Sequence, residues 1–561
     1  MAAGVSPPLF FWSPLSDMRS RSVLIVGGGS SGWMAAAYLE ASLRNDPRGK
    51  VEITLVESPD IPRIGVGEAT VPSIGHVLSV IGVDLVEFMR AVDGTFKQSI
   101  KHVNWLHDKD HSYHHPFSRD AYPSVDRAGI EWLMSDRSVP FMETVSPQPK
   151  LCHLGMAPVM LGQWDFGAPL AYAFHLNAQK FADFLRDVAT RRGVVHVIDN
   201  VTDVELKEDG HIAAVKTKEG GRLAADLFID CTGFVSLLIE KALKVGWVDF
   251  SQWLLCNRAL VMRVPHELYY PGQVRPYTTA TALSNGWVWE TVLGSGRAIG
   301  YVHSSDHISL DDAETELHRY EGPHSKNLDT RPVHFKVGMR EKAWVKNCIA
   351  IGLSGGFIEP LESTGLYLSY LAAIVLQEQF PYRDEDMETM AFRANRIMAT
   401  RYYEILDFIN LHYCLTKRTD SDFWREVQRP ERVVPRLKAK LEYWRRKPPS
   451  AVDFIDQFLP GMSNDGMNPG SFAGDHRPLV DTGGLWNHHS YECILYGMDF
   501  MADEYKERYG NDRPKPRVAQ PVIDRLRAAP AKLPPHDVWL QRVIGMENYG
   551  PRNDDWCAGR A

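Results

Sequence analysis

Clustered cysteines are absent from this sequence. It has seven cysteines among 561 residues, and no two of them form a CxxC pair. Scattered cysteines do not build the clusters that bind zinc or the disulfide frameworks of small secreted domains, and they are typical of a reducing compartment. We therefore expect neither a cysteine zinc site nor a disulfide scaffold, and we expect a cytoplasmic protein.

Long apolar runs are absent too. No stretch of the sequence approaches the roughly 18–20 apolar residues that a membrane-spanning helix needs. Residues 7–14 (PPLFFWSP) are apolar, but the run is short and flanked by proline. It has neither the basic segment nor the cleavage-like site of a signal peptide. We expect no membrane contact, and we interpret residues 1–20 as a disordered or start-site extension.

Positive charge is not in excess. The 62 Lys and Arg residues are outnumbered by 70 Asp and Glu residues, which gives a net charge of −8. Nothing in this balance favours a nucleic-acid partner. A content of 44% apolar and 24% charged residues is ordinary for a globular protein. The length predicts two or three structural units.

A βαβ unit begins the ordered part of the chain. Ser22–Val26 (SVLIV) is typical of a buried parallel strand, residues Trp33–Leu43 are typical of a helix, and Val51–Val56 predicts a second strand. Glu57 ends that second strand, where an acidic side chain accepts hydrogen bonds from ribose hydroxyls. The unit therefore predicts a dinucleotide site.

The loop inside this unit has the GxGxxG spacing, GGGSSG from Gly27 to Gly32. Gly27 permits the tight turn, Gly29 lets the backbone approach a pyrophosphate, and Gly32 lets the helix pack closely on the strand. The N–H groups of Ser30 and Ser31 open the helix, whose N-terminus favours phosphate. We expect these residues to bind the cofactor.

Two distant segments favour FAD over NAD. Asp226–Phe234 (DLFIDCTGF) and Cys348–Gly365 (CIAIGLSGGFIEPLESTG) each run from a short strand into a turn of small residues. Chains that return to one dinucleotide three times are typical of large FAD proteins, and Gly352 and Leu353 lie at the third return. The sequence has no second glycine fingerprint that would bind NAD(P)H.

Over residues 20–500 the chain resembles the flavin-dependent halogenases of the tryptophan halogenase family. The resemblance rests on the segments VLIVGGGSSGWMAAAYL, RIGVGEATVPSI, GTFKQSIKHVNW, YAFHLNAQKFADFL, DLFIDCTGF, NGWVWE and IGLSGGFIEPLESTG. It implies that FADH₂ from a separate flavin reductase reacts with O₂ to form a flavin hydroperoxide. A halide ion, chloride or bromide, is oxidised to hypohalous acid, which passes through a tunnel to a lysine beside an electron-rich aromatic substrate.

The resemblance places that lysine at Lys97 and its partner glutamate at Glu362. Lys97 would either donate a hydrogen bond to the hypohalous acid or carry the halogen as a chloramine. Glu362 would either polarise the halogen species or accept the ring proton. Ser363, Thr364 and Gly365 would bind the halide through converging N–H groups and the Ser363 hydroxyl, although a helix cap would use the same groups.

The resemblance also implies a strap between the two ligands. Within residues 65–72 (GVGEATVP), the predicted flavin contacts are Gly67, Glu68 and Ala69, and the predicted substrate contact is Pro72. The family segment that packs on the substrate ring falls on His115 and Phe117. We expect no metal ion, because the adjacent histidines at 114 and 115 have no second ligand cluster at usable spacing.

Two features depart from the family pattern. The WxWxIP signature reads WVWETV at Trp287–Val292, so both tryptophans remain but Ile-Pro becomes Thr-Val. Because that motif is credited with preventing monooxygenation, a flavin-dependent monooxygenase acting on an aromatic substrate is the alternative function. Residues 408–424 resemble members that take free indoles or other aromatics, so a simpler or larger indole, or a phenol, is expected before free tryptophan.

The expected fold is α/β. It combines a Rossmann-type FAD-binding domain and an interleaved mixed sheet, at residues 21–380, with a mainly helical substrate-covering region at residues 381–512. A proline-rich tail follows at residues 513–561. The sequence leaves open whether the chain forms a homodimer.

Overall fold

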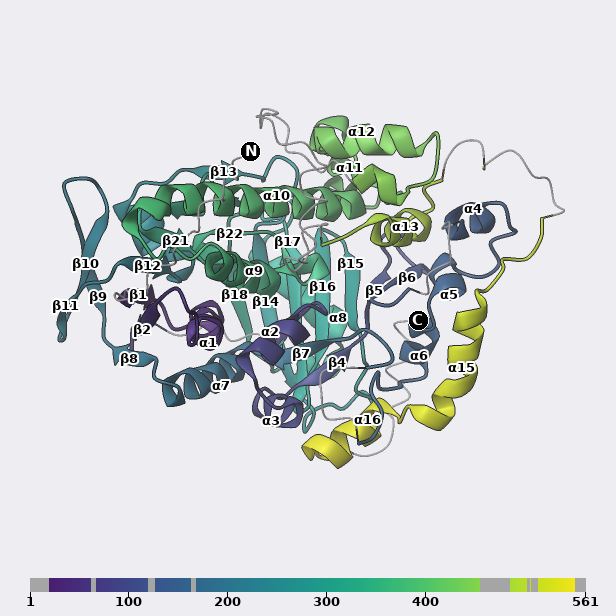
Figure 1. Ribbon diagram of the computed structural model, residues 1–561. Coiled ribbons are helices and arrows are strands. Elements are labelled where there is room, and N and C mark those ends of the chain that lie inside the picture. Colours follow the sequence, from purple (N-terminus) through teal and green to yellow (C-terminus); the bar gives the residue numbers. More distant parts are fainter. Residues whose placement is uncertain are drawn as a thin grey trace, which may run out of the picture.

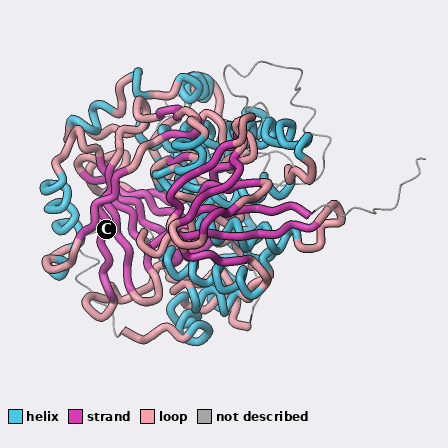
Figure 2. Tube along the Cα trace, turned by 90° about the vertical axis from the view of Figure 1, so that its left-hand side faces the viewer, coloured by secondary structure: helices cyan, strands magenta, loops and turns pink. Residues whose placement is uncertain are grey.

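The computed structural model describes residues 20–61, 67–119, 127–162, 168–454, 485–501, 505 and 513–549. The predicted N-terminal extension lies outside these residues, apart from Ser20. Two residues of the predicted strap, Gly65 and Val66, also lie outside them. Within the described residues, helices surround strands that run through the middle of the molecule (Figures 1 and 2).

A largely parallel sheet forms from the predicted βαβ unit and the two returning segments. Strand β1 pairs in parallel with β2 on one side and with β12 on the other. It is almost wholly buried because α1 (Ser30–Leu43) packs on one face of this sheet, flanked by α7 (Ala178–Arg191) and α9 (Thr364–Glu378), and a second apolar cluster fills the other face. In order across the sheet the strands are β20 (Trp344–Val345), β21 (Cys348–Ala350), β12 (Leu227–Asp230), β1 (Ser20–Val26), β2 (Lys50–Glu57) and β8 (Val195–Ile198).

A second, seven-stranded sheet lies beside the first and is antiparallel except where β15 pairs with β5. It brings residues near 100 next to residues near 280, which is the interleaving that the sequence predicts. In order the strands are β18 (Thr330–His334), β14 (Arg258–Pro265), β17 (Gly296–His303), β16 (Gly286–Val292), β15 (Thr278–Leu283), β5 (Ser99–Val103) and β6 (Ser112–Pro116).

A small sheet places the strap beside the predicted lysine. Strand β7 (Ala173–Asn177) pairs with β3 (Gly67–Ala69) on one edge and with β4 (Thr95–Lys97) on the other. His175 is the common register point, opposite Ala69 in β3 and Thr95 in β4. The strap and the lysine strand are therefore fixed to each other through one central strand.

The remaining strands form two short sheets. These are β9 (Val201–Leu206), β10 (Ile212–Thr217) and β11 (Gly221–Leu223) in one, and β13 (Trp247–Asp249), β19 (Gly338–Arg340) and β22 (Gly356–Phe357) in the other.

The α-helices cover the sheets. Up to residue 380 they are α1 (Ser30–Leu43), α2 (Ile74–Ile81), α3 (Leu85–Ala91), α4 (Ala128–Leu133), α5 (Phe141–Val145), α6 (Gln148–His153), α7 (Ala178–Arg191), α8 (Leu310–Glu321) and α9 (Thr364–Glu378). The combination of a parallel sheet, a mixed sheet and surrounding helices confirms the predicted α/β fold class.

Helices make up the regular structure in the described part of residues 381–512. They are α10 (Met387–Cys414), α11 (Asp422–Glu426), α12 (Pro435–Trp444) and α13 (His488–Gly497). The long helix α10 lies above α9 (Figure 1). Its buried residues are spaced along one side up to Tyr402, and every residue from Glu404 to Tyr413 is buried. No helix among the described residues is both long and apolar enough to cross a bilayer.

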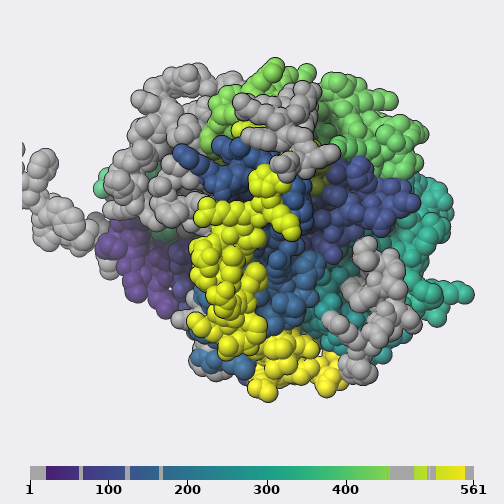
Figure 3. All heavy atoms as spheres, turned by 90° about the vertical axis from the view of Figure 1, so that its right-hand side faces the viewer, coloured from purple at the N-terminus to yellow at the C-terminus, as the bar shows by residue number. Residues whose placement is uncertain are grey.

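The C-terminal segment 513–549 packs against the body of the protein. Helix α15 (Gln520–Lys532) lies along the surface over α6, as Figure 3 shows in yellow, with Ala529 and Leu533 against Leu151. Helix α16 (His536–Trp539) enters the core. There His536 Nε2 accepts a hydrogen bond of 3.1 Å from the backbone N–H of Phe96, and Trp539 packs on the Phe96 ring. The segment thus supports the strand that carries Lys97.

Candidate functional site

A cavity of about 630 Å³ lies at the carboxyl ends of β1, β2 and β12. This is where ligands bind in open α/β sheets. The predicted cofactor residues that line it are Gly27, Gly29, Ser30, Ser31, Glu57, Gly67, Glu68, Ala69, Gly352 and Leu353. Thr232 and Gly233 of the second returning segment also line it, so three segments distant in sequence meet around one cavity.

The space around the loop glycines is consistent with a bound dinucleotide. A Cβ atom on Gly32 would lie 1.9 Å from the carbonyl oxygen of Gly27, so this position holds the helix against the strand. A Cβ atom on Gly29 would meet no protein atom within 4 Å, because that side of the loop faces the cavity. The residues present therefore fit a pyrophosphate at the N-terminus of α1.

Gly29→Val is expected to weaken FAD binding by at least about tenfold, or about 1.4 kcal/mol, without unfolding the protein. The valine would fill the space of the pyrophosphate, while Gly29 has an ordinary φ of −76° that valine tolerates. Titration of FAD fluorescence checks the affinity, and thermal unfolding without FAD checks the fold. Gly32→Val is the control: its side chain would clash with backbone and should lower the unfolding temperature. Unchanged FAD affinity in Gly29→Val would contradict the placement of the pyrophosphate beside Gly29.

Two acidic side chains face the cavity with different surroundings. Glu57 Oε1 lies 2.8 Å from His196 Nε2, which fixes the carboxylate at the end of β2. Burial raises the pKa of Glu68 in the strap to about 7, so this group changes charge near neutral pH. The Glu57 carboxylate is placed to accept hydrogen bonds from ribose hydroxyls. Glu68 lies in strand β3, which connects the cavity to the part of the site that contains Lys97.

Lys97 is fully buried at the end of β4. Its Nζ donates hydrogen bonds to the carbonyl oxygen of Thr70 (3.1 Å) and to Ser363 Oγ (2.7 Å), and it lies 5.2 Å from the centre of the Phe117 ring. Burial lowers the pKa of Lys97 to about 7, although the negative charge of Glu362 opposes this shift. An amine with this pKa is available in both charge states near neutrality.

Glu362 lies in a ring of three histidines, of which only His115 is a predicted site residue, and it is predicted as a substrate contact rather than as a partner of Glu362. The carboxylate is 2% exposed; His102 Nε2 and His412 Nε2 each lie 3.1 Å from its Oε1, and His115 Nδ1 lies 2.9 Å from Oε2. Burial alone would raise the pKa of Glu362, but these histidines hold it well below its usual range.

Sequence reasoning missed His102 and His412. Both occur in segments that resemble the family, yet His102 comes from β5 and His412 from α10, and no spacing in the sequence brings them together. The only available signal was that a buried carboxylate beside Lys97 needs partners. Of the residues that could hold a metal ion, the described part of the chain brings together His102, His412 and Glu362.

Aromatic side chains surround this side of the site. His115 lies 5.7 Å from the Phe408 ring, and Phe408 stacks on Trp486 with ring centres 4.1 Å apart. Phe117 lies beside Lys97, as described above. Pro72 is partly buried in the turn that precedes α2, and its predicted contact with substrate stays a prediction.

The predicted halide residues lie between the two halves of the site. Ser363 and Gly365 line the cavity, while Ser363 Oγ also accepts the Lys97 hydrogen bond. The Ser363 side chain does not cap α9, and its N–H is engaged by Pro360. Thr364 Oγ1 is buried and has no hydrogen-bond partner among the described residues. An anion there would therefore use Thr364 and Gly365 rather than the N–H of Ser363.

The altered signature keeps both tryptophans in β16. Trp289 and Thr291 line the flavin cavity. Trp287 is buried behind them, and its Nε1 donates to Glu359 Oε2 at 2.8 Å. The bulk that crowds the cavity is retained although proline is replaced by Val292.

Comparison with known proteins identifies the family. The family model for tryptophan halogenases matches residues 22–513. Tryptophan 6-halogenase ThaL of Streptomyces albogriseolus is 34% identical over 504 residues, which is 86% of this chain and 90% of the relative. Tryptophan 7-halogenase KtzQ of Kutzneria sp. is 35% identical over 511 residues, which is 87% of this chain and 91% of the relative.

Solved structures agree with this match. The tryptophan halogenase of Shewanella frigidimarina superposes with a TM-score of 0.82 at 32% identity, over 95% of this chain and 99% of that one. BrvH, a flavin-dependent halogenase of Brevundimonas sp., gives a TM-score of 0.76 at 30% identity, over 94% of this chain and 100% of that one. With a match that spans the flavin cavity, Lys97 and Glu362, the chain belongs to the tryptophan halogenase family and is a flavin-dependent halogenase.

Proposed function

We propose that this enzyme uses FADH₂, O₂ and chloride or bromide to halogenate an electron-rich aromatic ring of the indole type, with Lys97 and Glu362 as its catalytic residues. The observation that carries the proposal is the position of Ser363. Ser363 lines the flavin cavity, and its hydroxyl oxygen also receives a hydrogen bond from Lys97. An oxidant produced in the cavity thus has a short polar route to the buried amine.

Bound reduced FAD supplies, with O₂, the oxidation of halide to hypohalous acid. We assign its binding to the cavity residues described above, and halide binding to Thr364, Gly365 and the hydroxyl of Ser363. Anions bind where N–H groups converge at a helix N-terminus, and the unpartnered Thr364 hydroxyl supports this position. The halide would then lie between the cavity and Lys97.

Lys97 holds the halogen species next to the substrate. As an ammonium group it donates a hydrogen bond to the hypohalous oxygen. As an amine it takes the halogen from hypohalous acid, so that the N–halogen bond replaces the O–halogen bond and water leaves; a pKa of about 7 permits both. Glu362 stays ionised because the histidines lower its pKa. A protonated ring cation loses its proton so readily that even a weakly basic carboxylate can accept it.

The substrate is assigned to the aromatic side of the site. His115 and Phe117 would pack on the ring, with Pro72 at the strap. Several relatives are named for halogenating tryptophan, whose ring is an indole, so the ring type is shared. Because residues 408–424 resemble members that take free indoles, we place a free indole before tryptophan.

A separate flavin reductase is the proposed source of FADH₂, since the sequence has a single glycine fingerprint. The described cysteines are all free, which supports the expected reducing cytoplasm.

The expected result of the decisive assay is a brominated product only when a reductase is added. The purified chain with FAD and NADH should not oxidise NADH, because its sequence has a single glycine fingerprint, which is assigned to FAD. With a flavin reductase, bromide, and a panel including indole, phenol and tryptophan, mass spectrometry should reveal the bromine isotope doublet. Rapid NADH oxidation by the chain alone would refute the two-component assignment, and a hydroxylated product without bromine would favour the monooxygenase.

A further inference from the structure

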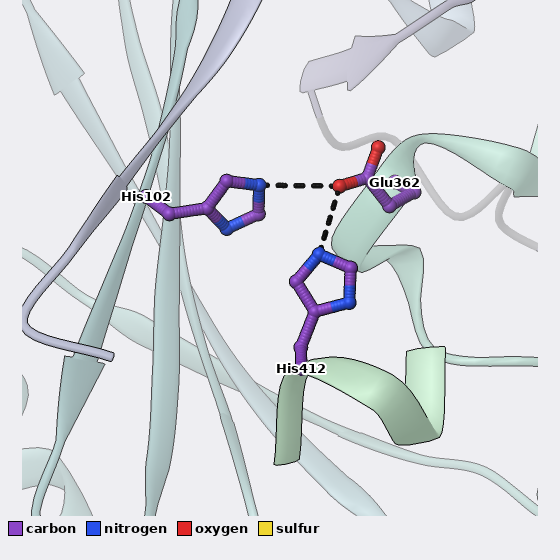
Figure 4. Close-up of side chains that lie close together, drawn as sticks. All are labelled: His102, Glu362 and His412. Atoms are coloured by element: carbon purple, nitrogen blue, oxygen red, sulfur yellow. Dashed lines mark hydrogen bonds and ion pairs between the residues drawn. The ribbon is translucent and has the colours of Figure 1, made fainter. Parts of the chain in front are cut away.

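Two histidines and Glu362 form a compact cluster beside the catalytic lysine. His102 comes from β5, His412 from α10, and Glu362 from the short 3₁₀ turn Pro360–Glu362 that precedes α9. Both Nε2 atoms point at the same carboxylate oxygen from 3.1 Å (Figure 4). All three side chains are buried, and their ligand atoms lie within 4.8 Å of one another.

The hydrogen bonding of His412 makes this contact unusual. Its Nδ1 lies 2.8 Å from the backbone carbonyl oxygen of Phe408, one turn earlier in α10. A carbonyl oxygen only accepts hydrogen bonds, so Nδ1 carries the hydrogen and Nε2 of the neutral ring carries a lone pair. That lone pair faces a carboxylate oxygen, which is also an acceptor. A positive species within reach of both atoms, either a proton or a metal ion, is needed to relieve the repulsion.

The donors and their spacing suit a metal ion of the zinc type. Two imidazole nitrogens and one carboxylate oxygen are a common ligand set for zinc, and bonds of about 2.0–2.2 Å in a tetrahedron separate the ligand atoms by roughly 3.3 Å. The two measured nitrogen–oxygen separations of 3.1 Å are close to this value.

The surroundings hold both rings ready for such an ion. Ligating histidines commonly donate their second N–H to a backbone carbonyl, as His412 does to Phe408. His102 is held by stacking on Tyr113, with ring centres 4.8 Å apart and planes inclined by 16°. His115, at 2.9 Å from Oε2, or a solvent molecule is available as the fourth ligand.

We propose that His102, Glu362 and His412 bind a divalent transition-metal cation such as Zn²⁺, and that its binding inhibits the enzyme. The ion is no resident cofactor; it occupies the carboxylate oxygen and neutralises the charge that Glu362 needs for catalysis. The binding itself is independent of the reaction, whereas the inhibition rests on the proposed role of Glu362. Cysteine plays no part in the site, so the scattered cysteines do not exclude it.

Binding is tested without turnover. Tag-free protein with bound FAD is first stripped of metal with a chelator. It is then equilibrated with zinc sulfate in competition with a chromophoric chelator. The equilibration lasts hours because the site is buried. We expect one Zn²⁺ per chain with a Kd below about 10 µM, and visible d–d absorption when Co²⁺ replaces it. His102→Phe should weaken binding at least about tenfold. His412→Gln serves as a second ligand variant should His102→Phe fail to fold.

The matched control is His211→Phe. His211 Nδ1 lies 3.1 Å from Asp209 Oδ1 on the surface, so this variant removes a histidine–carboxylate pair outside the cluster. It should leave the stoichiometry and the Kd unchanged. If wild-type protein binds no Zn²⁺, or if folded His102→Phe and His412→Gln bind it as tightly as wild type, the cluster holds only a proton and the proposal is overturned.

Inhibition is measured separately. Zinc sulfate should suppress bromination by the wild type at the concentrations that fill the site, and excess chelator should restore it. The ratio of rates with and without Zn²⁺ should approach one in His102→Phe, whatever its basal rate, and NADH oxidation by the reductase alone serves as the control. Tight binding in a protein that never halogenates would refute the proposed function and leave the site standing; halogenation without binding would do the reverse.

Discussion

Replacing Lys97 with alanine is expected to abolish halogenation while FAD binding and the reoxidation of reduced FAD by O₂ continue at wild-type rates. The loss should be at least about 10²–10³-fold, the usual effect of removing one group that holds a reacting species. Lys97 is not among the described residues that line the cavity, and its hydrogen bond to Ser363 connects it to the lining. Product quantification and stopped-flow absorbance of the flavin measure the two properties on the same sample.

The fold of the variant is checked with Lys97→Met, which keeps more of the side-chain volume. Burial lowers the pKa of Lys97 from 10.5 to about 7, so the buried ammonium destabilises the folded state. This cost is fully present below pH 7 and disappears as the pH rises toward 10.5. Lys97→Met should therefore raise the unfolding temperature most at low pH. If either variant still brominates at near the wild-type rate, Lys97 is not catalytic; if FAD binding is lost instead, Lys97 is structural.

Glu362→Gln is expected to slow the halogenation step by roughly 10²–10⁴-fold, the range for a general acid–base group. Glutamine keeps the shape of the side chain and removes its charge, so the three histidines lose their anionic partner and the ring proton loses its acceptor. Reoxidation of reduced FAD in the presence of bromide should be unchanged, because Glu362 does not line the cavity. Stopped-flow absorbance and product quantification separate these effects.

Glu359→Gln is the matched control for this change. Glu359 is a second buried carboxyl in the same loop, and its Oε2 accepts hydrogen bonds from Trp287 Nε1 and the Tyr413 hydroxyl. Burial raises its pKa to about 7, and a glutamine oxygen can accept the same two bonds. We expect less than about a threefold change in rate. Wild-type activity in Glu362→Gln would remove its catalytic role, and failure of FAD reoxidation would place it in the flavin site.

The flavin half of the site was predictable because its chemistry is local. The spacing of Gly27, Gly29 and Gly32 predicts a turn within six residues. In the structure Gly27 has a positive φ of 112°, Gly29 borders the cavity and Gly32 lies against the Gly27 carbonyl. The two returning segments each begin with a short buried strand, which a sequence pattern also detects. These parts of the prediction therefore needed no knowledge of distant contacts.

The surroundings of Glu362 could not be predicted in the same way. His102 lies 260 residues from Glu362 in the sequence and His412 lies 50 residues from it. Which histidine reaches a buried carboxylate depends on how β5 and α10 pack on the 3₁₀ turn, and that packing is collective. The family resemblance identified His115 as a site residue because its segment could be aligned as a unit. It assigned no role to His102 or His412.

The contact between His536 and the Lys97 strand has a consequence for synthesis. Phe96 and His536 are 440 residues apart, and a chain that grows by about 5–20 residues per second takes roughly 20–90 s to cover that distance. During this interval the strand that carries the lysine lacks the ring that receives its N–H and the indole of Trp539 that packs on Phe96. The segments that line the flavin cavity extend to Ser369, so they can be complete before α16 is made, whereas the strand that carries Lys97 gains this support only afterwards.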